Sequence, residues 1–111
     1  MIEIENIEEF TMRYIFKNGS ECYDCIQVED SLVLSPDKQT VKATLKAKQN
    51  TVNLAPFDII VTKKDDKYWI KSDFFEEVST LYRLNIFEGD DEYILMTEFP
   101  TEVMYLHAEH V

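Results

Sequence analysis

The sequence predicts an α+β fold: a twisted antiparallel β-sheet or small, partly open barrel, packed against one main α-helix over residues 73–84. Short runs of alternating apolar and polar residues recur along the chain, which is typical of half-buried strands. Turn-forming residues separate these runs. Residues 56–82 carry strand, turn, strand and helix patterns without interruption. We therefore expect about six to eight strands in a single domain that covers residues 1–111.

The first half of the chain predicts a hairpin. Residues 11–17 alternate, and Asn18-Gly19 follows. Asn-Gly between alternating runs is a strong signal for a two-residue type I′ turn, because both central positions of that turn need positive φ. We expect the return strand over residues 21–28. Residues 41–46 alternate again, with apolar side chains on one side and a basic outer face on the other.

The segment 56–82 predicts a second hairpin followed by the helix. Two β-rich runs, 58–62 and 67–71, flank a polar tip. Ser72 or Asp73 would cap the helix, and Glu76, three residues after Asp73, completes a pattern that resembles a capping box. An apolar stripe at helical spacing is expected to face the core; it consists of Phe74, Val78, Leu81 and Tyr82.

Two regions fit more than one element. Residues 2–10 match both the spacing of a strand and that of a helix. Near the C-terminus, Pro100 suits the first turn of a short helix, while residues 103–107 fit a strand nearly as well. Residues 93–97 predict a further strand.

The charge is strongly negative and unevenly distributed. The formal net charge is −11 over 111 residues. Residues 1–30 hold eight acids and two bases, residues 31–72 four acids and eight bases, and residues 73–111 ten acids and one base. Two acidic flanks thus enclose a basic middle segment, whose outward lysines would neutralise part of the acidic charge within the fold. This balance disfavours direct nucleic-acid binding, which needs a basic surface.

The composition points to a cytoplasmic protein. No apolar run approaches the ~20 residues of a membrane-spanning helix. The first ten residues are acidic, whereas a secretory signal begins with basic residues. In that compartment the two cysteines are expected to be reduced.

Cysteine and histidine pairs near the two ends of the chain form a weak candidate metal site. Cys22 and Cys25 lie near the N-terminus, and His107 and His110 lie near the C-terminus. Zinc accepts these four residue types. However, Cys22 and Cys25 would point to opposite faces of a regular strand, and two residues between histidines are fewer than is usual. We therefore expect no cofactor, with zinc as the exception to test.

An acidic tract is the main candidate for partner binding. The turn before the predicted strand at 93–97 is loaded with carboxylates, namely Glu88, Asp90, Asp91 and Glu92. Such a tract can steer a basic protein onto itself, with carboxylates in place of phosphates. We therefore expect a non-enzymatic interaction protein whose acidic flanks bind a basic or nucleic-acid-binding protein. High charge that serves only solubility is the simpler interpretation.

Part of the chain resembles a known family. The quoted runs are Val41-Lys42-Ala43, Pro56-Phe57-Asp58-Ile59-Ile60-Val61, Tyr68-Trp69-Ile70, and Phe74-Phe75 with Tyr82. They resemble the small PGDYG-type proteins of bacteriophages and their hosts, over residues 41–82. Phe57 stands where that family has glycine. The resemblance implies strands followed by a helix and a possible phage setting, and it implies no established activity.

Two alternative functions stay open at this point. The chain could be a structural or oligomer-forming accessory protein held together through Trp69 and its sheet edges. It could also be a small metal-stabilised domain or an uncharacterised enzyme, although the sequence contains no calcium-loop spacing, phosphate-binding glycine loop or nucleophile elbow. No catalytic residue is therefore assigned.

Overall fold

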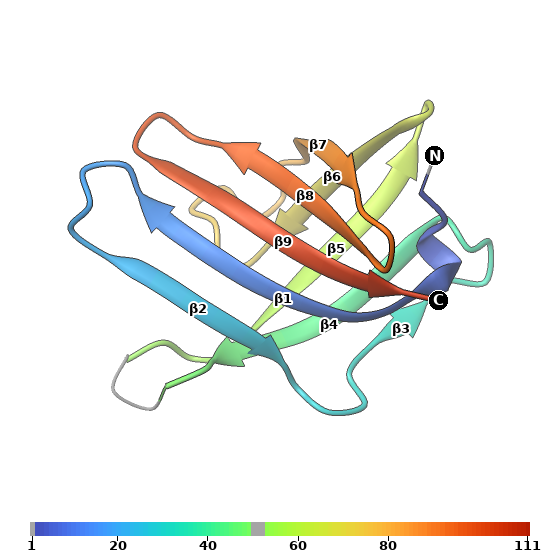
Figure 1. The fold of residues 1–111 in the computed structure, drawn as a ribbon, viewed down its shortest axis with the longest axis horizontal. Helices are drawn as coiled ribbons and strands as arrows, with labels where there is room; N and C mark the ends of the chain where they lie inside the picture. Colours follow the sequence, from blue (N-terminus) through green and yellow to red (C-terminus); the bar gives the residue numbers. More distant parts are fainter. Residues whose placement is uncertain (1, 50–52) are drawn as a thin grey trace.

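Nine β-strands form the fold over the described residues (Figure 1). A computed structural model describes residues 2–49 and 53–111. Every strand pairing in it is antiparallel. In chain order, the elements are the 3₁₀ turn η1 (Ile4–Asn6) and the strands β1 (Ile7–Phe16), β2 (Cys22–Gln27), β3 (Val33–Leu34), β4 (Thr40–Ala47), β5 (Phe57–Lys64), β6 (Lys67–Ser72), β7 (Tyr82–Glu88), β8 (Glu92–Glu98) and β9 (Glu102–His110).

Eight of these strands close into a barrel. The hydrogen-bonded order runs β2-β1-β9-β8-β7-β6-β5-β4, and the pairing of β2 with β4 completes the circle. In that seam Cys25 lies opposite Ala47, and Gln27 lies opposite Leu45. The two-residue strand β3 is attached to the outside of the circle through β4. Closure satisfies the edges that an open sheet would leave unpaired.

The α+β prediction is wrong, because the fold is an all-β barrel. Within residues 2–49 and 53–111 the one helical element is η1. The predicted main helix at 73–84 is a loop over residues 73–81 that leads into β7. Its expected core stripe does not face the core as one: Phe74 and Tyr82 are half-buried, whereas Val78 is 51% exposed and Leu81 is 36% exposed.

The residues that resembled a helix cap tie this loop to the barrel instead. The Asp73 carboxylate accepts a hydrogen bond from the backbone N–H of Asp58 on β5, at 2.8 Å. The Ser72 hydroxyl donates to the carbonyl of Asp58 and accepts from the N–H of Phe74. Serine and aspartate favour such local bonds in turns as well as at helix caps, so the pattern alone did not separate the two.

The barrel interior is filled by side chains, with aromatic residues at one end. Inward positions alternate with outward ones along each strand, and Phe10, Leu45, Ile70 and Leu106 are fully buried. At one end, rings from strands and loops pack edge to face or at tilted angles; they are Tyr14, Phe16, Tyr23, Phe57, Phe74, Phe75, Tyr82 and Phe99. Loop 73–81 is fixed here because Phe74 and Phe75 belong to this cluster.

The two predicted hairpins are present, and the first has a different turn from the one expected. At Asn18-Gly19, only Gly19 has positive φ, +76°, so this is not a type I′ turn. The N–H of Phe16 bonds to the carbonyl of Glu21 across a four-residue loop. The tip between β5 and β6 instead has positive φ at both Asp65 and Asp66, which is the type I′ geometry.

Both ambiguous regions contain strands. Residues 4–6 form the 3₁₀ turn and β1 begins at Ile7, while the C-terminal segment is β9 rather than a short helix. Strands β1 and β9 pair with each other over almost their full lengths. In the part of the chain that the structure describes, no helix has the length and apolar character needed to cross a membrane.

Candidate protein-binding face

The pairing of β1 with β9 brings the two acidic flanks of the sequence together. Glu9 on β1 lies opposite Glu109 on β9, and Glu109 lies opposite Glu92 on β8. The adjacent row of the same strands consists of Phe10, Ala108 and Tyr93, which are buried. Because side chains alternate along a strand, the three glutamates face outward. We call Glu9, Glu109 and Glu92 the acidic row.

The acidic row places like charges on directly opposed residues, an arrangement that destabilises a sheet. The His107 ring lies beside the row, with Nδ1 3.5 Å from Glu92 Oε2. Beside the row, the turn between β7 and β8 adds further carboxylates, and the N–H of His110 bonds to the Asp91 carbonyl at 3.1 Å. A shallow hollow of about 250 Å³ opens there, lined by Glu8, Asp91, Glu92, Glu109 and His110.

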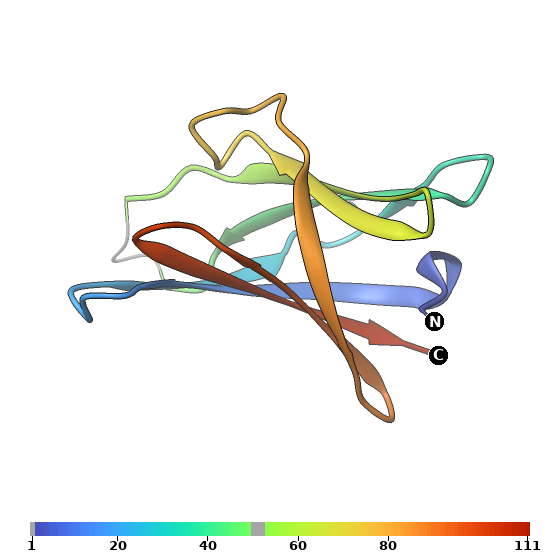
Figure 2. The same ribbon diagram turned by 90° about the horizontal axis from the view of Figure 1, so that it is seen from above.

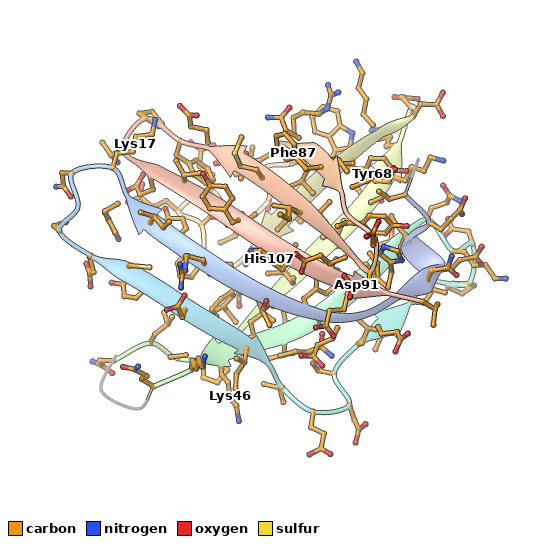
Figure 3. All side chains as sticks on the ribbon, viewed as in Figure 1. Lys17, Lys46, Tyr68, Phe87, Asp91 and His107 are labelled. Carbon is orange, nitrogen blue, oxygen red and sulfur yellow. The ribbon has the colours of Figure 1, made fainter. Side chains whose placement is uncertain are left out.

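The predicted tract thus forms part of a larger acidic surface. Glu88 ends β7, Asp90 and Asp91 form the turn, and Glu92 begins β8. Glu88, Asp90 and Asp91 are exposed, and Glu92 is half-buried. In Figure 3 this surface faces the reader, with His107 near its middle and Asp91 beside the C-terminus.

The barrel separates acids from bases on opposite sides. Strands β1, β8 and β9 contain six glutamates and one arginine, whereas β4, β5 and β6 contain six lysines and one aspartate. In the circle of eight strands, β5 is four strands from β9 in either direction. Figure 2 shows these two groups of strands on opposite sides. We call the outer surface of β1, β9 and β8 the acidic wall, and that of β4, β5 and β6 the basic wall.

This separation limits the partial neutralisation that was expected between the basic middle segment and the acidic flanks, which is present where Lys38 Nζ lies 3.3 Å from Glu5 Oε2. The lysines of the basic wall point outward on the far side of the barrel, beside Asp58, which Lys42 contacts at 3.4 Å. Outside that wall, Lys38 forms an ion pair with Glu5 and Lys17 forms one with Glu98. The carboxylates of the acidic row face outward away from the basic wall.

An apolar groove lies next to the acidic row. The next outward-facing row lies two residues further along the same strands. It consists of Ile26, Thr11, His107, Ile94 and Phe87, which belong to β2, β1, β9, β8 and β7 in that order. The row after that contains Tyr105 and the ion pair of Arg13 with Asp24, at 2.8 Å. Together with Lys48 near the β2 end, these rows line a hollow of about 710 Å³, which we call the groove.

The weak metal candidates do not converge. Cys22 lies opposite Ile15 at one end of β1, while His110 lies opposite Ile7 at the other end. Eight residues of strand separate these positions by about 26 Å at ~3.3 Å per residue. Cys22 is exposed and Cys25 is buried. Among the described residues there is no group of three or more histidine, cysteine or acidic side chains placed to hold a metal ion.

His110 and Cys25 are instead held by the barrel. The His110 ring stacks on Tyr93, with centroids 4.0 Å apart. Burial raises the pKa of the Cys25 thiol to about 11, and the neighbouring Asp24 adds to the effect. A thiol with such a high pKa is a poor nucleophile and a poor metal ligand at neutral pH.

Trp69 and the sheet edges, which the oligomer alternative needed, are largely used within the chain. The Trp69 indole N–H donates to the Lys64 carbonyl at 3.3 Å, and the Arg83 guanidinium lies 5.9 Å from the ring centroid. Barrel closure pairs the long strands on both sides. The described edge that projects from the circle is the two-residue strand β3.

Comparisons with known proteins add no assignment: a scan against protein-family models, a search of curated proteins and a search of solved structures each find no match. The PGDYG resemblance over residues 41–82 therefore stays a prediction.

Sequence reasoning found one part of this face and missed the rest. The tract at Glu88 to Glu92 was visible as a local run of acids. Glu9 and Glu109 belong beside it only because β1 pairs with β9, and these residues are far apart in sequence. The groove was also missed, although Ile94 and Phe87 occupy positions of local alternation that could have indicated an outward apolar row.

Proposed function

We propose that this protein is a non-enzymatic cytoplasmic binding module whose acidic wall binds a cationic surface of another protein. The observation that carries the proposal is the acidic row, in which three glutamates stand in register across β1, β9 and β8. Such a row costs stability in the free protein. The lysines that could have shielded it lie on the opposite side of the barrel.

The spacing of the row suits a partner that also binds nucleic acid. Neighbouring strands are about 4.8 Å apart, so the row presents one negative charge about every 5 Å. Each strand of DNA presents one charge per ~3.4 Å of helix axis. A protein groove lined with lysine and arginine would therefore meet a similar line of negative charges. Carboxylates in place of phosphates would make this module a competitor of nucleic acid.

The test is capture of partners from host lysate at low and at moderate salt. The immobilised protein is compared with a variant that carries Glu9→Gln, Glu92→Gln and Glu109→Gln. A matched control carries Glu21→Gln, Glu76→Gln and Glu77→Gln, which change the net charge equally at exposed sites outside the acidic wall. We expect the wild type and the control to retain a basic protein that the acidic-row variant loses.

Competition identifies the nature of the captured partner. If the module mimics phosphates, added nucleic acid releases the partner, and the captured amount falls as salt rises. Recovery of no basic or nucleic-acid-binding protein at either salt concentration would refute the proposal. Capture that falls equally in the acidic-row variant and the control would show that net charge, rather than the row, is responsible, and undiminished capture by the acidic-row variant would refute the proposal.

A further inference from the structure

We infer that the groove beside the acidic row binds a basic amphipathic α-helix of the partner protein. This inference rests on the proposed function and names the structural class of the partner segment. It depends on three features of the described residues. They are an apolar groove on the barrel exterior, a row of carboxylates two residues away along the same strands, and strands at the middle of the groove whose main-chain groups are already paired.

The groove exposes more apolar surface than a barrel exterior requires. Phe87 is 55% exposed, the largest fraction among the phenylalanines in the described parts of the chain. It lies opposite Ile94, which is half-buried and also faces outward. Ile26 occupies the far end of the same row, on β2. Aromatic and aliphatic side chains in a hollow are the usual anchors of a protein interface.

Charge complementarity defines the chemistry of the occupant. The acidic row lies two residues along the same strands from the groove row, because Glu9 precedes Thr11, Glu92 precedes Ile94 and Glu109 follows His107. At ~3.3 Å per residue, the two rows are about 7 Å apart. A lysine or arginine beside an apolar anchor can span that distance, since its long stem packs on apolar surface while its charged head reaches the carboxylates.

The completed strand ladders favour a helix over an extended segment. At the middle of the groove, β9 pairs with β1 on one side and β8 on the other, so an incoming strand finds no free edge there; at the groove's end, the β6–β7 pairing covers Tyr82 to Leu84 and stops short of Phe87. An extended peptide laid on the groove would leave its own N–H and C=O groups without partners over an apolar surface. A helix satisfies these groups internally. Five strands at ~4.8 Å spacing extend about 19 Å, which is the length of about 13 helical residues.

A second copy of this chain fits the groove less well. Each copy would bring its own acidic row toward the other, and like charges across an interface oppose association. The net charge of −11 has the same effect over longer distances.

The experiment uses designed peptides of about 14 residues. The first carries leucines at helical spacing and lysines elsewhere. The second has the same composition in scrambled order, without an apolar face, and the third replaces the lysines with glutamates. Binding to the full-length protein is followed by fluorescence anisotropy at low salt and at ~0.15 M salt. We expect the order amphipathic basic, scrambled basic, then acidic, with roughly tenfold or more between the first two at ~0.15 M.

A matched pair of variants locates the site. Ile94→Thr removes an apolar anchor from the groove, whereas Ile60→Thr makes the same change at an outward, half-buried position of the basic wall. We expect Ile94→Thr, and likewise Phe87→Ser, to weaken the amphipathic peptide about tenfold, and Ile60→Thr to change its affinity less than about twofold. Circular dichroism checks that each variant keeps its strands.

Each outcome bears on one proposal or the other. Equal affinity of the amphipathic and scrambled basic peptides, or no effect of Ile94→Thr, overturns the groove inference and leaves the acidic-row proposal standing. Failure of both basic peptides to bind at low salt overturns both proposals. Binding of the acidic peptide as tightly as the basic ones would show that the groove binds apolar side chains regardless of the peptide's charge. That result also refutes the inference.

Discussion

The acidic and basic walls share one barrel and one core, and they differ almost only in the residues at their outward positions. On both walls, inward side chains are buried and aliphatic, as Leu106 on β9 and Ile59 on β5 illustrate. Outward, β1, β8 and β9 carry glutamates, while β4, β5 and β6 carry lysines. Both walls oppose like charges, because Lys64 lies opposite Lys67 at the tip between β5 and β6, and Glu109 lies between Glu9 and Glu92. The difference is that the acidic row continues across three strands, whereas the lysine pair spans two.

The largest expected effect is a difference in reactivity between the two cysteines of β2, the strand at the seam that joins the two walls. Cys25 faces the core with 1% of its surface exposed, and its pKa is raised to about 11, while Cys22 is exposed. At pH 8, about one Cys25 thiol in a thousand would be ionised even if reagent could reach it. We therefore expect one thiol to react rapidly with a disulfide reagent in the native protein and two after unfolding in urea. Rapid reaction of both native thiols would show that the seam is open.

The next largest expected effect is a loss of stability when a residue of the shared core is truncated. Leu106→Ala should lower the free energy of unfolding by about 2–5 kcal/mol, because it leaves a cavity at a fully buried site. Its neighbour His107 faces outward, so His107→Ala should change stability by less than ~0.5 kcal/mol. Urea unfolding of both variants measures the difference. Similar losses would mean that the inward and outward positions of β9 are misassigned.

Removing the carboxylate of the basic wall should destabilise the protein. The Thr44 hydroxyl donates to Asp58 at 2.7 Å, and Lys42 lies 3.4 Å away. Because the Asp58 side chain is 42% exposed, the ion pair itself contributes little. The amide oxygen introduced by Asp58→Asn can still accept from Thr44, so weakening of this charge-assisted hydrogen bond accounts for most of the expected loss of about 1 kcal/mol or less. Urea unfolding at pH 7 measures this loss, and an unchanged midpoint would contradict it.

The same variant should show a pH-dependent difference from the wild type. The Thr44 hydrogen bond, aided by Lys42, lowers the pKa of the Asp58 carboxyl below its ordinary 3.8. A lowered folded-state pKa contributes stability that is present above pH 3.8 and is lost as pH falls through the folded value. The gap between wild type and Asp58→Asn should therefore narrow below pH 3.8. A gap that stays constant down to acid unfolding would argue against the ionised carboxylate as its source.

Removing a carboxylate from the acidic wall should have the opposite sign and the smallest size. Glu109 is opposed by Glu9 on one side and Glu92 on the other, so Glu109→Gln should raise the free energy of unfolding by about 0.5 kcal/mol or less. The gain should shrink in high salt, which screens exposed charges. Thermal unfolding at two salt concentrations measures it. Destabilisation at low salt would mean that the acidic row is compensated within the free protein.

Local features of the fold could be predicted from the sequence, whereas the predicted main helix at 73–84 was wrong. The alternation at 41–46 correctly placed Lys42 and Lys46 on the outer face of β4. The Lys-Asp-Asp tip correctly marked a turn between two strands. The segment 73–84 failed because Ser72 and Asp73 make the same kinds of bonds in a loop as at a helix cap, and because Phe74 and Phe75 are held by an aromatic cluster drawn from distant strands.

The sequence by itself determined where several strands and turns lie, with β7 missed and two terminal strands left open, which side of several strands faces out, and that the chain carries acidic flanks around a basic segment. These properties depend on neighbouring residues, through the two-residue period of a strand and the φ preferences of turns. Only the tertiary structure decided that Glu9 lies beside Glu109, that the lysines lie on the far wall, and that the groove borders the acidic row. Such pairings between distant residues follow from closing all eight strands around one core, which no local pattern encodes.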